Sequence, residues 1–429
     1  MVTTNSYSSM QMRFDEANMK LYDVIGIGFG PANLALAIAL QEQGKLTDKV
    51  CFIEKQPNFL WHGGMLLDDT TMQISYLKDL VTQRNPTSHF SFTNFLHHQN
   101  RLDSYINLKT FYPSRLEFNS YLSWAASHFN DFCHYAEEVT DIIPIIEQNG
   151  VEFLAITTRN SEGHEQTRHA KNIILSPGGN AKIPDVFNDV FQHKNVWHSS
   201  QYLMNKDKIK PGEKVAVIGA GQSAAEIFVD VQNIPHQPQV DLVFRAGAMK
   251  PADSSPFVNE IFDPRYTDLM YQNTPEQRSA FLTEFRNTNY AVVDEPLLND
   301  IYGRLYTQKL KNETRFSIKN NTHIDAATLS GDKICLTLRY GQHNSQFEKY
   351  DHMILATGYH YSSRPPLLES VTQWLENDIA RDYQLRTVET FKPKIFTQGI
   401  NEATHGISDS LLSILAIRSA EIANALELS

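Results

Sequence analysis

Residues 21–40, LYDVIGIGFGPANLALAIAL, carry the strongest structural signal in the chain. The apolar run Leu21–Ile27 predicts a buried strand, the glycines predict a turn, and Asn33–Leu40 predicts a helix. Glycines let a backbone approach a pyrophosphate, and the following helix directs free N–H groups and its positive dipole at that charge. A second apolar run, Val50–Ile53, completes the opening of a βαβ unit. The segment therefore predicts a dinucleotide-binding fold.

The turn itself is irregular. After Gly26 and Gly28, the third glycine of the usual pattern is replaced by Pro31, with Gly30 one position early. Proline near a helix start is tolerated because its missing N–H has no helical partner there. Glu54 closes the second strand, where a carboxylate can accept both ribose hydroxyls. A glycine turn at an ordinary strand–helix corner is the alternative, and Glu54 favours the dinucleotide.

A similar unit begins at residues 214–229, KVAVIGAGQSAAEIFV. Alanine at the third position of this turn is an accepted variant. The following strand, Val240–Phe244, ends at Arg245 instead of an acid. A guanidinium would clamp a 2′-phosphate that a carboxylate would repel, whereas a solvated strand-end charge is the other interpretation. The two units together indicate FAD at the first site and NADPH at the second.

Two later strand ends resemble each other. The run Asn172–Leu175 ends at SPGG, residues 176–179, and His352–Leu355 ends at ATGY, residues 356–359. Small residues there suit either close approach to a cofactor or a turn with positive φ, and both interpretations stay open. The last segment, Ser410–Leu426, has helical spacing of apolar residues and predicts a C-terminal helix.

These features predict an α/β protein with two Rossmann-like domains, for FAD and NADPH, and a small substrate-binding region. We expect a flexible N-terminal arm at 1–20, the first part of the FAD-binding domain at 21–205 and the NADPH-binding domain at 206–345. A substrate-contacting segment is expected at about 250–300 of the second domain. Residues 346–429 are expected to return to the FAD-binding domain and end in the helix.

Composition excludes several classes of protein. The net charge is −11, from 49 acidic and 38 basic residues, which argues against nucleic acid or an anionic membrane as partner. Cys51, Cys133 and Cys335 are isolated, so we expect no metal site, no disulfide framework and no disulfide-reductase chemistry. No secretory signal or membrane-spanning run is visible. These observations favour the cytoplasm.

Several strings go beyond generic dinucleotide binding. In chain order they are Trp61-His62, MQISYLKDLV (72–81), RNPTS (84–88), GQSAAE (221–226), SPFVNE (255–260), NTNY (287–290) and HGISDSLLS (405–413). With them the chain resembles the microbial N-hydroxylating flavin monooxygenases of class B type, the ornithine and lysine N-monooxygenases of hydroxamate siderophore biosynthesis. The resemblance runs from about residue 21 to 426. The NTNY string looks more like the ornithine branch.

The resemblance implies three groups of site residues. The FAD group is Gly26, Gly28, Gly30, Pro31, Glu54, Trp61, His62, Gln73, Ser408, Asp409 and Leu412; the NADPH group is Gly219, Gln222, Ser223 and Arg245; the substrate group is Lys78, Asn259, Asn289, Leu411 and Ser413. Each has an ordinary alternative: Lys78 as a surface ion-pair residue, the asparagines as turn residues, His62 as a packing partner of Trp61, Ser413 as a helix serine.

The resemblance also implies the chemistry. NADPH reduces FAD, O₂ then forms a C4a-hydroperoxyflavin, and the terminal primary amine of a small substrate is hydroxylated for siderophore-based iron acquisition. L-Ornithine, giving N5-hydroxyornithine, is the expected substrate. Asn259 is the candidate catalytic residue because an amide can hold a neutral amine, and Lys78 with Asn289 suits an α-carboxylate.

Alternatives stay open at this point. L-Lysine, putrescine, cadaverine or histamine could take the substrate position. A Baeyer–Villiger or S-oxygenating enzyme and a non-enzymatic nucleotide-binding protein are the other classes, and the substrate-side strings argue against both. The resemblance suggests a homo-oligomer, either a tetramer or a dimer.

Overall fold

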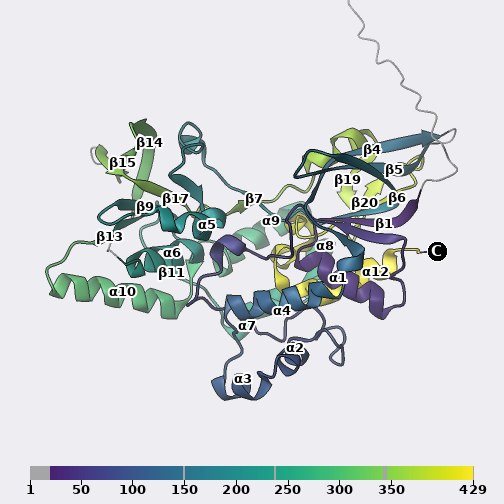
Figure 1. The fold of residues 1–429 in the computed structure, drawn as a ribbon, viewed down its shortest axis with the longest axis horizontal. Helices are drawn as coiled ribbons and strands as arrows, with labels where there is room; N and C mark the ends of the chain where they lie inside the picture. The colour runs from purple at the N-terminus through teal and green to yellow at the C-terminus, as the bar shows by residue number, and fades with distance from the viewer. Residues whose placement is uncertain (1–19, 148–149, 236–237, 342–344, 429) are drawn as a thin grey trace, which may run out of the picture.

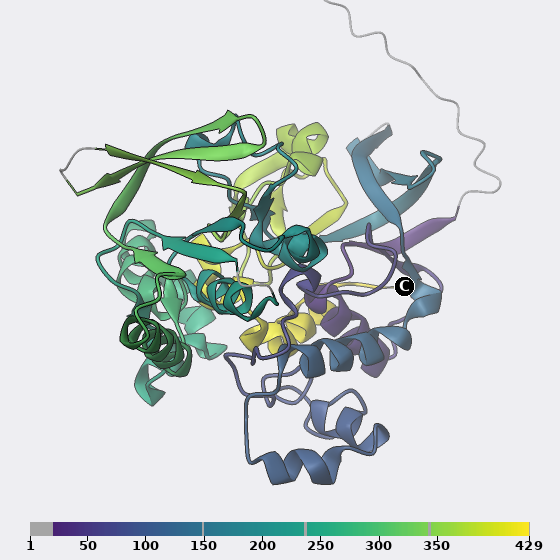
Figure 2. The same ribbon diagram turned by 60° about the vertical axis from the view of Figure 1, so that its left-hand side comes forward.

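The computed structural model describes residues 20–147, 150–235, 238–341 and 345–428. They form two lobes, each built on a mainly parallel sheet (Figures 1 and 2). The expected N-terminal arm lies outside the described residues except for Lys20. Among the described helices, none combines the length and apolar character needed to cross a membrane.

The first sheet has the strand order β3-β2-β1-β6-β5-β4, with β21 also paired to β6. The bounds are β1 Leu21–Ile27, β2 Val50–Ile53, β3 Cys133–His134, β4 Glu137–Glu147, β5 Gly150–Asn160, β6 Glu165–Leu175 and β21 Lys394–Thr397. Strand β5 pairs antiparallel with both β4 and β6, and the other pairings are parallel. Long strand β6 binds β5 with its first half, and β1 and β21 with its second half.

Helix α1, Pro31–Glu42, is buried almost all round. Every residue from Asn33 to Leu40 is inaccessible to solvent. Helices α12, Leu415–Ala425, and α4, Arg115–Ser127, pack against it, and this explains its continuous apolar sequence. The C-terminal segment therefore helps to cover the first glycine turn.

The second sheet, β13-β10-β9-β17-β8, is wholly parallel. Its strands are β8 Val196–His198, β9 Lys214–Ile218, β10 Gln239–Val243, β13 Phe316–Lys319 and β17 His352–Leu355. Helices α6, Gln222–Asn233, and α10, Glu295–Leu310, pack on one face. The antiparallel sheet of β14 Thr322–Ser330, β15 Lys333–Tyr340 and β16 Ser345–Tyr350 packs on the other. The two mainly parallel sheets confirm the predicted fold class.

Shorter elements connect these layers. They are α2 Phe92–His98, α3 Leu102–Leu108, α5 Tyr202–Asn205, α7 Pro256–Asn259, α8 Arg265–Gln272, α9 Pro275–Glu284, α11 Glu402–His405, β11 Lys250–Pro251, β12 Val292–Val293, β19 Leu375–Ile379 and β20 Leu385–Thr387. Helices α7, α8 and α9 lie within the expected substrate-contacting segment.

The chain crosses between the lobes at a two-stranded ribbon. Strand β7, Asn180–Ala181, pairs antiparallel with β18, Tyr359–His360, and β7 lies between the lobes in Figure 1. The crossings differ from the expected boundaries at 205/206 and 345/346, because β8 and β17 both join the second sheet. The sequence predicts the run of β17 but not that of β8, and the place of both strands in this sheet depends on pairing between distant segments.

The C-terminal helix differs from the expectation in its start. It begins at Leu415 instead of Ser410, after two 3₁₀ turns at Ile407–Ser410 and Leu412–Ile414. Leu411 between the turns is extended, with φ −108° and ψ 165°. The reason is tertiary, since Asp409 is held by distant partners that are described below.

Candidate cofactor and substrate site

The first glycine turn is shaped by close backbone contact. Gly28 has φ 82°, its N–H donates to Ile53 O at 2.8 Å, and a Cβ there would lie 2.5 Å from Ser176 O. Helix α1 begins directly after Gly30, with Pro31 as its first residue. The unbonded N–H groups of this helix start meet the requirements of a pyrophosphate.

Glu54 lies beside that turn and is 9% exposed. One carboxylate oxygen accepts from Phe29 N at 2.7 Å and the other from Gln56 N at 2.9 Å. These bonds hold the carboxylate at the end of β2, and each oxygen keeps acceptor capacity for a hydroxyl. The arrangement fits the ribose role that the sequence predicts.

The second turn has the same backbone arrangement. Gly219 has φ 147°, its N–H donates to Val243 O at 3.1 Å, and a Cβ would lie 2.4 Å from Ala356 O. Helix α6 starts at Gln222, followed by partly accessible Ser223, and offers a second anion-binding helix terminus. The small residues that end β6 and β17 therefore serve both turns by allowing close approach.

Two predicted NADPH residues differ in their surroundings. Arg245 is exposed just beyond the end of β10, and its contact with a 2′-phosphate stays a prediction. The Gln222 amide is already engaged, because its oxygen accepts from Asp294 N and its nitrogen donates to Glu226, both at 2.8 Å. The amide nitrogen keeps a second N–H and the oxygen a second lone pair, so Gln222 can contact a nucleotide without breaking either bond.

His62 and Trp61 form an aromatic wall between the lobes. Their rings meet edge to face with centroids 4.8 Å apart, and His62 also lies 5.9 Å from Tyr359. His62 adopts φ 51° and keeps accessible surface, yet desolvation by the surrounding protein lowers its pKa to about 4. His62 is thus an accessible imidazole that is neutral at physiological pH, and its contact with a flavin stays a prediction.

The predicted substrate residues Lys78 and Asn259 come from different segments. Lys78 is partly buried, and desolvation lowers its pKa while the charge of Asp263 opposes that shift. In the part of the chain that the structure describes, its ammonium has no hydrogen bond or ion pair. Asn259 is exposed and donates its amide to Ser254 O at 2.9 Å, which leaves its oxygen free to accept from an amine.

Asn289 is half-buried at the end of a 3₁₀ turn, Phe285–Thr288. The next residue, Tyr290, donates its hydroxyl to the Glu402 carboxylate across the lobes. Burial raises the pKa values of both Tyr290 and Glu402. Sequence reasoning missed Glu402, because no spacing in the chain relates it to Tyr290.

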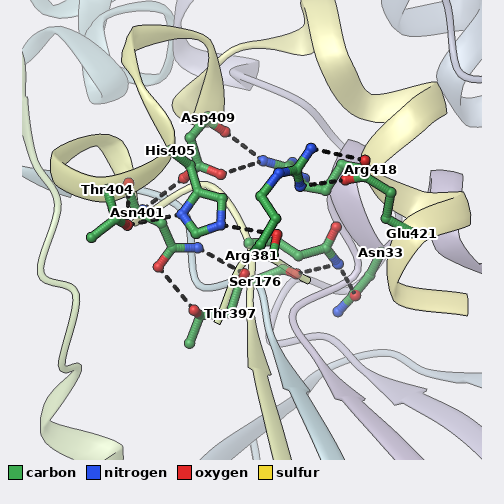
Figure 3. A network of polar contacts seen from close by, with 11 residues as sticks. Asn33, Ser176, Arg381, Thr397, Asn401, Thr404, His405, Asp409, Arg418 and Glu421 are labelled. Atoms are coloured by element: carbon green, nitrogen blue, oxygen red, sulfur yellow. Dashed lines mark hydrogen bonds and ion pairs between the residues drawn. The ribbon is translucent and has the colours of Figure 1, made fainter. Parts of the chain in front are cut away.

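The segment 405–413 is anchored from behind by the polar network of Figure 3. Asp409 is fully buried, accepts from Asn401 N at 2.6 Å and pairs with Arg418 Nη1 at 3.0 Å. Its carboxylate therefore faces the interior, so a contact with FAD would come from its backbone. Leu411 and Leu412 are partly accessible, and Ser408 and Ser413 are buried.

Two further polar residues adjoin the first turn and were not singled out from the sequence. Asn33 donates to Gly28 O at 2.6 Å, and Gln398 donates to Asn33 Oδ1 at 2.9 Å and Ser176 Oγ at 3.2 Å. Among the described residues, Gln398 Oε1 and Ser413 Oγ are buried acceptors without a partner. Likewise, no described group of three or more His, Cys, Asp or Glu is placed to hold a metal ion.

Comparison with known proteins agrees with this geometry. The L-lysine 6-monooxygenase/L-ornithine 5-monooxygenase family profile matches residues 20–361. An L-ornithine N(5)-monooxygenase of Pseudomonas aeruginosa is 46% identical over 420 residues, which cover 96% of this chain and 94% of that protein.

Two solved structures have the same architecture. The ornithine hydroxylase PvdA of P. aeruginosa superposes with a TM-score of 0.91 at 47% identity, covering 95% of this chain and 98% of that one. The ornithine N-hydroxylase KtzI of Kutzneria sp. 744, described with reduced FAD, NADP⁺ and L-ornithine, has a TM-score of 0.90 at 36% identity, covering 95% and 99%. With the profile match over most of its length, the chain belongs to the L-lysine 6-monooxygenase/L-ornithine 5-monooxygenase family, as its sequence motifs predict.

Proposed function

We propose that this protein hydroxylates the N5 amine of L-ornithine, using FAD, NADPH and O₂, in the biosynthesis of a hydroxamate siderophore. The names of the similar proteins support ornithine as the substrate. The observation that carries the proposal is the partly buried ammonium of Lys78, which has no hydrogen bond or ion pair among the described residues and interacts electrostatically with Asp263, in the segment that follows Asn259. Such a cation suits the α-carboxylate of an amino acid.

Each end of ornithine would meet a different kind of group. Lys78 would bind the carboxylate, and the Asn289 amide would add a hydrogen bond. The Asn259 oxygen would accept from the terminal amine without an opposing full charge. Because an ammonium has no lone pair, a site with neutral partners favours the free amine that must react. Asn259 is thus the proposed catalytic residue, with Leu411 and Ser413 near the reacting end.

The cofactor positions follow the two turns. FAD would lie along Gly26, Gly28, Gly30 and Pro31, with Glu54 at its ribose and Trp61, His62, Gln73 and the 408–412 segment around its ring. NADPH would lie at Gly219, Gln222 and Ser223 with its 2′-phosphate at Arg245. When bound, the flavin supplies the redox and oxygen chemistry, while the protein binds, orients and excludes water.

A comparison of two amines tests the carboxylate assignment. Putrescine is ornithine without its carboxylate, so it needs no partner for Lys78. Replacing Lys78 by Met should raise KM for ornithine by about ten- to a hundredfold, the size of a lost charge-assisted hydrogen bond. The KM for putrescine should stay within a factor of about two. Hydroxylamine product is measured, since uncoupled turnover also consumes NADPH.

The wild-type protein is tested against ornithine, lysine, putrescine, cadaverine and histamine in the same assay. Preference for ornithine supports the proposal, and preference for another amine replaces the substrate while keeping the chemistry. An unchanged KM for ornithine in Lys78→Met contradicts the role of Lys78. Lys109→Met, at an exposed lysine after α3, is the matched control.

Compartment and assembly complete the proposal. We place the protein in the cytoplasm as a homo-oligomer, either a tetramer or a dimer. Free Cys51, Cys133 and Cys335 support a reducing compartment. Exposed Tyr302, Tyr306 and Leu310 at successive turns of α10 support self-association. Cell fractionation and light scattering after gel filtration measure these two properties.

A further inference from the structure

A buried ion pair joins the two lobes at a place where the chain does not cross between them. Arg115, the first residue of α4 in the first lobe, forms two hydrogen bonds to Glu226 of α6 in the second, at 2.8 and 2.7 Å. Their side chains are 14% and 3% exposed. Paired donors on a guanidinium constrain both distance and direction, so this contact specifies orientation as well as proximity.

The same carboxylate is tied to the second glycine turn. Gln222, directly after Gly221, donates to Glu226 Oε1 and accepts from Asp294 N, both at 2.8 Å. Asp294, which precedes α10, in turn accepts from Gln73 of the first lobe at 3.0 Å. Arg115–Glu226 and Gln73–Asp294 are therefore two polar bridges between the lobes, with Gln222 between them. They stand beside the Tyr290–Glu402 contact and the packing of Met65 and Leu67 in the core of the second lobe.

On the first-lobe side, Gln73 and Arg115 are held together. Arg115 N donates to Thr70 O at 3.0 Å, and Met72 N donates to Pro113 O at 2.8 Å. The positive charge of Arg115 also contributes to the lowered pKa of His62. The bridging residues thus link the neighbourhood of His62 to the proposed NADPH turn.

The chain connection between the lobes is slender by comparison. It is the two-residue ribbon of β7 and β18, flanked by Gly178 and Gly358, which both have positive φ. Non-covalent contacts must therefore set the angle between the lobes, and that angle determines where a nicotinamide meets the flavin.

We propose that Arg115, Glu226, Gln222, Asp294 and Gln73 form a latch that fixes the NADPH-binding lobe on the FAD-binding lobe and so positions the hydride donor. These are positioning residues for the reduction of the flavin. The inference rests on the proposed use of both cofactors. Its structural part, the fixed angle between the lobes, is independent of turnover.

Glu226→Gln tests the latch because it keeps the shape and removes the charge. The matched control is Glu137→Gln, which weakens a similar two-bond pair with Arg168 inside the first lobe, at 2.7 and 3.1 Å. Spin labels at exposed Ser120 of α4 and Thr307 of α10, in a Cys335→Ser background, report the distance between the lobes of the FAD-loaded protein.

We expect a single narrow distance distribution in the wild type and in Glu137→Gln, and a broad one in Glu226→Gln. Anaerobic mixing with saturating NADPH should show flavin reduction slowed by about ten- to a hundredfold in Glu226→Gln alone, since small misplacement of reacting groups has effects of this size. If Glu226→Gln does not fold, Asp294→Ala breaks the second bridge without leaving a buried charge and should broaden the distribution similarly.

Unchanged distances in the variants overturn the latch. A broad distance distribution with an unchanged rate of flavin reduction overturns the positioning role. If Glu137→Gln slows flavin reduction as much as Glu226→Gln does, the slowing comes from a general loss of stability, and the positioning role is overturned as well. If the wild type does not oxidise NADPH, the proposed function fails, whereas the distance measurement still tests the latch by itself.

Discussion

The two glycine turns share a backbone and differ in what surrounds them. In each, a glycine N–H donates to the end of the neighbouring strand, Gly28 to Ile53 O and Gly219 to Val243 O. In each, a Cβ would collide with a carbonyl at the end of a third strand, that of Ser176 or Ala356. The helix after the first turn is enclosed on all sides, whereas the helix after the second keeps a polar face.

This difference matches two kinds of ligand use. The first turn is covered by α12 and by the polar network around Asp409 and Arg418, which suits a cofactor that stays bound. The second turn is open at Arg245, and its helix is attached to the other lobe through Glu226. That openness suits a cosubstrate that must enter and leave on each cycle. The same backbone arrangement can therefore hold either a cofactor that stays bound or a cosubstrate that exchanges on each cycle.

The largest expected effect comes from the cover of the first turn. Asp409→Ala should lower the free energy of unfolding by about 3–5 kcal/mol, because it leaves the Arg418 guanidinium buried without its carboxylate. Asp325→Ala removes an exposed pair with Arg339 in the second lobe and should have little effect. Urea unfolding of both variants measures these free energies of unfolding. A similar loss of stability in Asp325→Ala would contradict the prediction.

Alanine at each glycine separates folding from binding. Gly28→Ala should cost about 3–4 kcal/mol of stability and abolish FAD retention, because strain at positive φ adds to the clash with Ser176 O. Gly219→Ala should meet a similar clash yet retain FAD and lose NADPH affinity. Thermal unfolding, flavin content and NADPH titration are the measurements.

Gly30→Ala is the control for that series. Gly30 has φ −79°, and a Cβ there has no neighbour within 4 Å, so the stability of the apoprotein should be unchanged. Its FAD affinity should fall, since the added methyl group would occupy space at the proposed pyrophosphate. A loss of stability in the Gly30→Ala apoprotein would contradict this, because it would show that alanine destabilises the turn without positive φ or a steric clash.

The polar network that covers the first turn should also make the stability of the fold depend on pH. His405 is fully buried, its ring contacts Thr404 Oγ1 and Arg381 O, and desolvation lowers its pKa from 6.5 to about 4. Below pH 6.5 the unfolded chain takes up a proton that the folded chain refuses, so stability is complete above that pH. It should fall by about 3 kcal/mol as the pH drops to 4.

His405→Gln should remove this part of the acid sensitivity. The measurement is the free energy of unfolding between pH 7 and pH 4 for the variant, the wild type and His164→Gln, which alters an exposed histidine. A wild-type pH dependence that persists in His405→Gln would show that other groups cause it.

The smallest expected effect belongs to the open second turn. Arg245→Ala should weaken NADPH binding by about ten- to a hundredfold, the size of a lost charge-assisted contact to the 2′-phosphate, and leave NADH binding unchanged. Steady-state KM values for both nucleotides measure it, with binding titration of the apoenzyme as support. Equal weakening of NADH and NADPH would contradict a 2′-phosphate role.

Local sequence predicted much of the fold. The strands Leu21–Ile27, Val50–Ile53, Lys214–Ile218 and His352–Leu355 have the bounds that their apolar runs indicate. These runs succeed because a strand, a glycine turn and a helix start all depend on neighbouring residues. The start of the C-terminal helix was misplaced, because its preceding turns depend on Asn401 and Arg418.

The candidate site divides in the same way. Gly28, Gly219, Glu54 and Arg245 could be named from motif and spacing alone, since each lies at a position that the strand–turn–helix pattern defines. The inward carboxylate of Asp409 and the engaged side chain of Gln222 could not, because their partners lie elsewhere in the chain.

Local patterning thus established two dinucleotide units and the types of group at their ends. Tertiary structure alone determined which helix is enclosed and which is open, and how the lobes are joined. Gln398 meets Asn33 across 365 positions, and Arg115 meets Glu226 across 111. Periodicity reports on residues that share an element, whereas such pairs depend on how whole elements pack, and no local pattern encodes that arrangement.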